Sequence, residues 1–135
     1  MPGEAKDIEL PLSGKRVVRF CVERGLSLEF SEHERLVVGV YKRFLLCGGG
    51  GEQSLSAEDL GDAAKAIVLV RKVTKNGVAR RNGTLEISFA DGYELSVPPD
   101  PQSDAWKFSG TDILIGSDPG GGLTVFRRPG IVPER

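Results

Sequence analysis

The feature of this sequence that most constrains its fold is an internal repeat. Val17 matches Val73, and the positions that follow match at a constant offset of 59 residues once a turn has lengthened by three residues. The matched apolar pairs are Leu26 with Leu85, Leu28 with Ile87, Phe30 with Phe89, and Leu36 with Leu95. Because the apolar positions persist while one turn grows, the repeat predicts a repeated architecture with copies at about 15–46 and 71–97.

Each copy shows the period-two alternation of strands with one buried face. In the first copy, Val18, Phe20 and Val22 alternate with polar residues. Short turns between the strands predict an antiparallel three-stranded meander in each copy. The third strand of the first copy is predicted to run on to Leu46, and the glycine-rich segment Cys47–Ser54 is predicted to be a loop.

One helix is predicted between the copies, at about 57–69. Ser56 and the acidic residues after it are typical of a helix N-terminus. The apolar residues recur at helical spacing at Leu60, Ala63, Ala64, Ile67 and Val68. The opposite, polar side carries Glu58, Asp59, Asp62 and Lys65. The helix is expected to cover an open end or face of the β structure.

We therefore predict a mainly β protein with one helix, built from the duplicated meander and a C-terminal hairpin at about 112–127. Its 135 residues suit a single domain, expected at 12–128. A flexible lead-in at 1–11 and a frayed tail at 129–135 are expected to flank it. Such meanders bury their apolar faces in a partial barrel or in a sandwich, and the pattern leaves both open.

The composition excludes several classes of site and partner. Its 18 basic and 19 acidic residues give no global attraction to nucleic acid or to an anionic membrane. No apolar run approaches the ~20 residues of a membrane span, and the N-terminus lacks the features of a signal peptide. We expect a cytoplasmic protein without a membrane partner. Two cysteines and one histidine predict no disulfide framework and no zinc site, and no cofactor is expected.

The leading functional hypothesis is a non-enzymatic protein-binding module. An acidic helix and a basic strand-turn, without a catalytic cluster, suit recognition of another protein through complementary charge. The acidic candidates for protein contact are Glu58, Asp59 and Asp62. The basic candidates are Arg71, Lys72, Lys75, Arg80 and Arg81.

Two alternatives come from other classes. The basic run around Arg80 and Arg81 is also what a nucleic-acid-binding hairpin needs, although a charged, protected sheet edge explains it equally well. A small-ligand site or a hydrolytic site at a barrel mouth is the second alternative, with Asp100, Asp104 and Trp106 as candidates. For Trp106 itself, a buried anchor that pins the proline-rich turn is the favoured interpretation.

Four segments together resemble a known family. They are Gly14-Lys-Arg-Val-Val, the run Gly83–Leu95, Val97-Pro-Pro-Asp-Pro with Trp106, and Pro119-Gly-Gly-Gly-Leu-Thr-Val. The chain resembles, over about 12–127, a family of small bacterial domains of unknown function with a VPPDPxxEAW-type signature. It departs from that pattern at Asp104, usually Glu, and at Thr124, usually Ala. The resemblance implies no catalytic residues. Small proteins of this kind resemble immunity proteins, which implies a toxin-like protein as partner.

Overall fold

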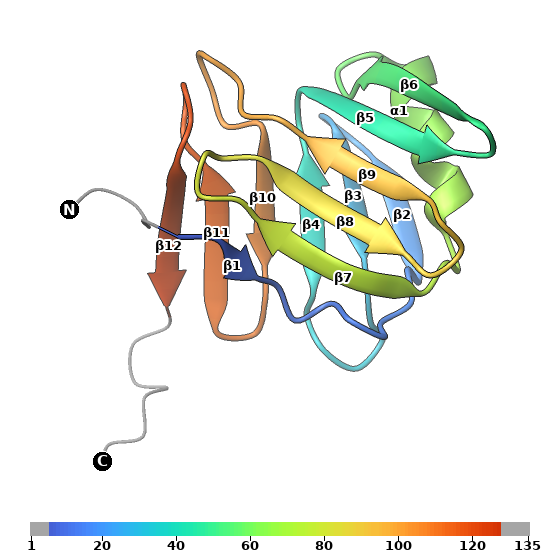
Figure 1. Ribbon diagram of the computed structural model, residues 1–135, viewed down its shortest axis with the longest axis horizontal. Helices are drawn as coiled ribbons and strands as arrows, with labels where there is room; N and C mark the ends of the chain where they lie inside the picture. The colour runs from blue at the N-terminus through green and yellow to red at the C-terminus, as the bar shows by residue number, and fades with distance from the viewer. Residues whose placement is uncertain (1–5, 128–135) are drawn as a thin grey trace.

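Twelve strands form two antiparallel sheets of six in residues 6–127, the part of the chain that the computed structural model describes. The two sheets stack as a sandwich (Figure 1). They do not close into a barrel, so the sandwich is the observed one of the two architectures that the sequence left open. The predicted class, mainly β with antiparallel pairing and one short helical segment, is confirmed.

The first sheet has the order β1-β7-β8-β9-β5-β6. Its strands are β1 Ile8–Glu9, β7 Thr74–Ala79, β8 Leu85–Phe89, β9 Glu94–Val97, β5 Arg43–Gly48 and β6 Gly51–Ser56. The second sheet has the order β12-β11-β10-β4-β3-β2. Its strands are β12 Leu123–Arg127, β11 Ile113–Ser117, β10 Trp106–Ser109, β4 Val37–Val40, β3 Leu26–Glu29 and β2 Arg19–Val22.

The two sequence copies form the meanders of opposite sheets. The first copy supplies β2, β3 and β4, and the second supplies β7, β8 and β9. Each meander is extended by strands that follow the other copy in sequence. β5 comes after the three meander strands of the first copy, at the end of its predicted range, and pairs with β9, while β10 follows the second copy and pairs with β4. The chain therefore exchanges strands reciprocally between its two halves.

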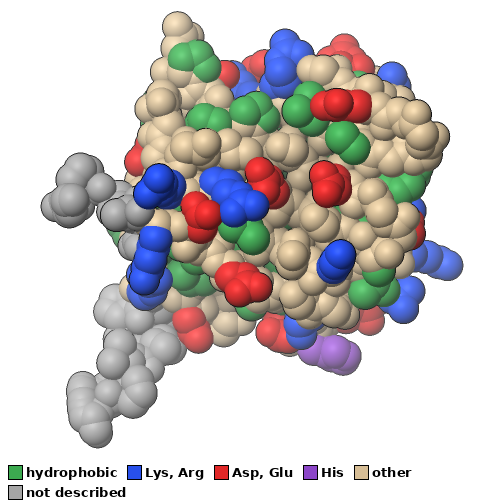
Figure 2. Space-filling model, viewed as in Figure 1, with side chains coloured by type: hydrophobic (Ala, Val, Ile, Leu, Met, Phe, Trp, Pro, Cys, Tyr) green, Lys and Arg blue, Asp and Glu red, His purple; other side chains and the backbone are tan. Residues whose placement is uncertain are grey.

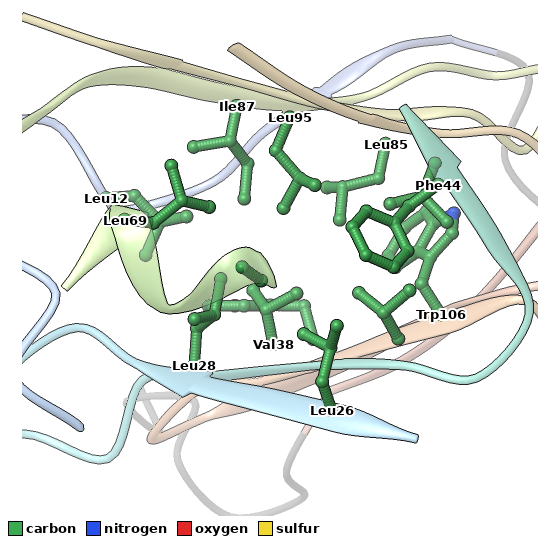
Figure 3. Packing of buried hydrophobic residues seen from close by; sticks show 14 of the residues in the cluster. Leu12, Leu26, Leu28, Val38, Phe44, Leu69, Leu85, Ile87, Leu95 and Trp106 are labelled. Atoms are coloured by element: carbon green, nitrogen blue, oxygen red, sulfur yellow. The ribbon is translucent and has the colours of Figure 1, made fainter. Parts of the chain in front are cut away.

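The matched apolar residues of the two copies share one interior. All four predicted pairs, from Leu26 with Leu85 to Leu36 with Leu95, are buried. Figure 3 shows Leu28 and Val38 from one sheet facing Ile87 and Leu95 from the other. This common interior explains why the repeat preserves side-chain positions rather than surface residues, because close packing tolerates little change in volume.

The first copy departs from its predicted strand pattern after Val40. The third strand does not run on to Leu46, because the chain leaves the second sheet at Tyr41 and Lys42 and enters the first sheet as β5. The predicted loop at Cys47–Ser54 is also wrong. β5 and β6 form a continuous hairpin there, with Gly48 paired to Gly51 across a two-residue turn. Consecutive glycines with positive φ suit such a tight hairpin turn.

The lead-in contains more structure than the sequence indicated. Ile8 and Glu9 form β1 against β7, and Leu10 is buried. Residues 1–5 of the expected lead-in and the expected tail at 129–135 lie outside the described residues. The predicted C-terminal hairpin is present as β11 and β12.

The helical segment closes one side of the sandwich. It consists of α1 Leu60–Ala64 and a 3-10 helix, η1 Lys65–Leu69. α1 contacts both β6 and β2, which are edge strands of different sheets. In Figure 1 the segment lies behind β5 and β6, on the side of the molecule opposite to β1 and β12. The expectation that a helix covers an open part of the β structure is met at this side.

Candidate functional site: an apolar face on the helical segment

Local hydrogen bonds fix where the helical segment begins. Asp59, not Ser56, is the N-cap, and its carboxylate accepts a hydrogen bond from the Asp62 backbone N–H at 2.9 Å. The Asp62 carboxylate in turn accepts one from the Ser56 backbone N–H at 3.1 Å. Both aspartates therefore satisfy backbone donors that would otherwise lack partners at a helix start. Two of the three acidic contact candidates thus have structural roles.

The third acidic candidate, Glu58, forms an ion pair with Lys42. The Lys42 Nζ lies 2.9 Å from Glu58 Oε2. The hydrogen bond from Lys42 to this carboxylate raises the pKa of Lys42. The Glu58 side chain remains largely exposed, so it is available to a partner molecule, although an exposed pair of this kind contributes little to stability.

Four of the five apolar residues that the helical spacing grouped together lie on the outward side of the segment, and only Ala63 is buried. Ala63, Ala66 and Leu69 are buried, whereas Leu60 is 71% exposed, Ile67 60% and Val68 40%. The buried residues recur every three positions because the second half of the segment is a 3-10 helix with three residues per turn. We name the outward group of Leu60, Ala64, Ile67 and Val68 the helical apolar face.

A hollow of about 390 Å³ adjoins Val68 at one end of this face. It lies between η1, Tyr93 and the glycine hairpin Gly48–Gly51, and Lys65 stands at its rim. Gly48 packs directly on Tyr93: a Cβ at this position would lie 2.4 Å from the aromatic ring. The glycine run is therefore a packed wall of the hollow, shaped by the absence of side chains.

A second hollow of about 430 Å³ adjoins Leu60 at the other end of the face. It is bounded by Tyr41, Ala57 and the turn between β2 and β3. In this turn Arg24 and Gly25 both adopt positive φ, which turns the chain tightly and leaves the Glu23 and Arg24 side chains exposed at the rim. The helical apolar face is thus an exposed ridge with a hollow at each end.

Two of the five basic contact candidates, Lys72 and Arg80, form ion pairs with carboxylates. Lys72 forms an ion pair with Asp91 at 2.5 Å and lies 4.1 Å from the centre of the Tyr93 ring. The hydrogen bond from Lys72 lowers the pKa of Asp91. Figure 2 shows that, on the face formed by β7, β8 and β9, Lys and Arg side chains lie beside Asp and Glu. A surface of mixed sign does not make the continuous positive stripe that phosphate binding needs.

Arg80 lies between two carboxylates. It contacts Glu86 at 2.8 Å and Asp7 at 2.9 Å. These bonds raise the pKa of Arg80, and the pKa of Asp7 is lowered mainly by the hydrogen bond from the Arg81 backbone N–H. Arg71, Lys75 and Arg81 have exposed side chains. Arg71 lies in the turn after η1, Lys75 in β7, and Arg81 in the β7–β8 turn.

The ligand candidates of the proline-rich segment are not brought together. Trp106 is fully buried and its indole N–H donates to the Gly83 carbonyl at 2.8 Å, which makes it the anchor that the sequence favoured and leaves no ring surface for a ligand. Asp100 accepts hydrogen bonds from the backbone N–H groups of Gln102 and Ser103, and these lower its pKa. Asp104 instead lines a separate hollow beside β12.

Residues 6–127 contain no group of three or more His, Cys, Asp or Glu side chains placed to hold a metal ion. No helix in the same range is long and apolar enough to cross a membrane.

Comparison with protein-family models identifies the family of this chain. Residues 8–127 match the model of a family of unknown function, DUF6188. The chain belongs to this family. Comparisons with curated proteins and with solved structures each found no significant match.

In this DUF6188 member, sequence reasoning missed the residues that now define the candidate site. Leu60, Ile67 and Val68 were assigned to the buried side because they fit a regular α-helix. The three-residue spacing of Ala63, Ala66 and Leu69 was the available signal for the correct face. Phe126, 63% exposed on β12, was missed as well, because alternation alone does not distinguish the two faces of an edge strand.

Proposed function

We propose that this protein is a non-enzymatic protein-binding module that engages its partner through the helical apolar face. The observation that carries the proposal is the outward orientation of Leu60, Ile67 and Val68 on a segment whose other side is fully packed. Large exposed apolar patches mark interaction sites on proteins, whereas single exposed apolar residues are ordinary.

The shape of the helical apolar face and its two hollows suits a protein partner. Binding energy at protein interfaces concentrates in a few apolar or aromatic anchors that fill pockets near the centre of the contact. Here a ridge of aliphatic side chains lies between two hollows, one beside Val68 and one beside Leu60. A partner that places an anchor in each hollow would cover the ridge between them.

Charges around the ridge indicate the chemistry of the partner. Glu52, Glu58 and Asp59 are exposed near it, and Lys65 lies on the ridge itself. Glu52 is on β6, which α1 contacts. Around the ridge and its hollows, the exposed acidic side chains Glu23, Glu52, Glu58 and Asp59 outnumber the exposed basic ones, Arg24 and Lys65. This acidic excess favours a partner whose apolar contact is surrounded by Lys or Arg. An immunity-type inhibitor, which acts by covering a toxin protein, is the most specific form of this proposal.

Partner capture with matched variants tests the proposal. Immobilised wild-type chain is exposed to lysate of the source organism and the retained proteins are quantified by mass spectrometry. Affinity for the purified partner is then measured by calorimetry. The variant Leu60→Ser/Ile67→Ser removes the ridge, whereas Phe126→Ser removes an equally exposed apolar side chain on the opposite side of the molecule.

We expect the partner to bind the wild type and the Phe126→Ser chain alike, and the ridge variant at least ~100-fold more weakly, as when hot-spot residues are truncated. A partner that binds the ridge variant with wild-type affinity would refute the assigned surface. A reproducible turnover of any substrate by the purified chain would refute the non-enzymatic assignment. A toxin gene adjacent to this one would support the inhibitor role.

A further inference from the structure

The first sheet has an open edge along part of β6, its outermost strand (Figure 1). The residues Gly51–Ser54 of this strand are all exposed. Alternate residues of an antiparallel strand bond to the neighbouring strand. The two-residue turn between Gly48 and Gly51 sets this alternation, so that Glu52, Ser54 and Ser56 direct their N–H and C=O groups away from β5. An open edge of this kind can accept another strand.

The helical segment satisfies this edge at Ser56 and no further. The Ser56 N–H donates to the Asp62 carboxylate at 3.1 Å, and its carbonyl accepts a hydrogen bond from the Asp59 N–H at 3.1 Å. The outward groups of Glu52 and Ser54 have no such partner among residues 6–127. An added strand therefore finds free backbone groups between the helical segment and the glycine hairpin.

The two faces of the open edge differ in charge. On the inward face lies the hollow beside Val68, where Lys65 is the one charged lining residue. The Lys65 side chain has no ion-pair or hydrogen-bond partner in the described part of the chain. On the outer face, Glu52 and Glu94 lie opposite Cys47 on either side, and burial, followed by these two charges, raises the pKa of the thiol. A peptide along this edge meets positive charge on one face and negative charge on the other.

The glycine hairpin adds free N–H groups at one end of the edge. Gly49 and Gly50 form the turn with positive φ, and their N–H groups donate to no group within the described residues. This turn and Lys65 line the same hollow, and Val68 and the Tyr93 ring add apolar surface to it. Free backbone N–H groups beside a lysine suit a carboxylate, because hydrogen bonds to an ionised acceptor are the stronger ones.

We propose that β6 binds the C-terminal segment of a partner protein as an added antiparallel strand, with the terminal carboxylate at Lys65 and the glycine hairpin. Antiparallel pairing fixes the direction, because a strand that runs from Ser56 toward Gly51 ends beside the hairpin. Since β6 begins at Gly51, the last residue of the segment lies opposite Gly51 and the residue before it lies opposite Glu52. This inference rests on the proposed function, because the hollow is one end of the helical apolar face.

The register defines which C-terminal sequences fit. Side chains opposite one another in an antiparallel pair project from the same face. The last residue projects with Gly51 toward the hollow, where Val68 and Tyr93 favour an apolar side chain. The residue before it projects with Glu52 from the outer face, where Lys or Arg is favoured. The bound segment therefore ends in a basic residue, an apolar residue and a free carboxylate.

Selection from a peptide library displayed with free C-termini and randomised last four positions tests the recognition. Enriched sequences should end in Lys or Arg followed by Leu, Ile, Val or Phe. Fluorescence anisotropy then gives the affinity of an enriched, fluorescein-labelled peptide. Amidation of its C-terminus should weaken binding at least ~10-fold, and Lys65→Met should weaken it about 3–10-fold. A library without an enriched sequence, or equal affinity of the acid and the amide, overturns the proposal.

Charge reversal tests the register. Glu52→Lys should weaken binding of the peptide with a penultimate Lys about 3–10-fold and strengthen binding of its penultimate Glu version. Glu94→Lys is the matched control, because Glu94 projects from the same face on β9, two strands from the edge; both affinities should be unchanged. Equal effects of the two reversals overturn the register.

Amide hydrogen exchange tests the strand addition itself. The bound peptide should slow exchange of the Glu52 and Ser54 N–H groups at least ~10-fold, because each gains a hydrogen bond. The Gln53 N–H already bonds to β5 and should be nearly unchanged. Equal protection of all three groups, or protection of none, overturns the strand addition.

Binding of the captured partner separates this inference from the proposed function. If the library yields no sequence while Leu60→Ser/Ile67→Ser abolishes partner binding, the edge site is refuted and the proposed function stands. If peptides bind as expected while Leu60→Ser/Ile67→Ser keeps wild-type affinity for the partner, the assigned apolar face is refuted and the edge site stands.

Discussion

Replacing Trp106 by Phe removes a hydrogen bond that joins the two sheets. Trp106 begins β10 in the second sheet, and its indole N–H donates to Gly83 in the turn between β7 and β8 of the first sheet. Gly83 is tightly enclosed: a Cβ there would lie 3.0 Å from the backbone of Gly122. The Gly83 carbonyl therefore has little room to find water when the indole is removed.

The expected loss of stability has two parts. A buried carbonyl left without a donor costs about 1–3 kcal/mol. The smaller Phe ring buries up to about 40 Å² less apolar surface, which adds about 1 kcal/mol at ~25 cal/mol per Å². Together they predict that Trp106→Phe lowers the free energy of unfolding by about 2–4 kcal/mol. The neighbouring inward residue Phe108 provides the control. Phe108→Leu leaves a small cavity without removing an inter-sheet hydrogen bond and costs about 1–2 kcal/mol.

Urea unfolding followed by far-ultraviolet circular dichroism measures both variants, because Trp106→Phe removes the only tryptophan and with it the fluorescence probe. With a slope of about 2 kcal/mol per molar urea, the midpoint should fall by about 1–2 M for Trp106→Phe. A shift no larger than that of Phe108→Leu would refute the reasoning. It would show that the indole hydrogen bond does not help to hold the sheets together.

Three further predictions concern the core, the hairpin and acid stability. Leu28→Ala and Ile87→Ala should each lower the free energy of unfolding by about 2–5 kcal/mol in urea titrations, because both side chains occupy equivalent core positions; a loss below 1 kcal/mol at either would contradict this. Gly48→Ala should cost about 1–3 kcal/mol through its clash with Tyr93, and less in a Tyr93→Ala background, as thermal unfolding of the four chains would show. The pKa of Asp100 is lowered by the Gln102 N–H, so its contribution is present at neutral pH and lost below about pH 4; the gap in melting temperature between wild type and Asp100→Asn should close on acidification, and a constant gap would count against it.

The strand faces of the two copies could be predicted because alternation reports directly which side chains point inward. The same property hid the change of sheet at Tyr41 and Lys42. Val38 and Val40 point inward from one sheet, and Phe44 and Leu46 point inward from the other. Their parity is continuous through the crossing, so one long strand and two strands in different sheets give the same pattern.

Other elements were missed because their signals were weak or overlapped. The sequence predicts a loop at β6 because Gly51, Glu52, Gln53 and Ser54 show no apolar alternation. All four are exposed in the structure, where β6 is an edge strand. The helical segment was identified, but its inward face depended on the 3-10 geometry of η1, which regular helical spacing does not describe. Sequence alone could not separate protein-contact residues from helix-capping residues at Asp59 and Asp62, because aspartate near a helix N-terminus is typical of both an acidic contact surface and a cap.

The reciprocal exchange of strands has a consequence for the nascent chain. β4 receives its neighbour β10 only after the residues between Val40 and Trp106 have been made, and β5 waits in the same way for β9. A half-synthesised molecule therefore carries two unsatisfied sheet borders as it leaves the ribosome. Neither half is expected to be a self-sufficient folding unit, and two fragments cut between the copies should regain the native sandwich only when mixed.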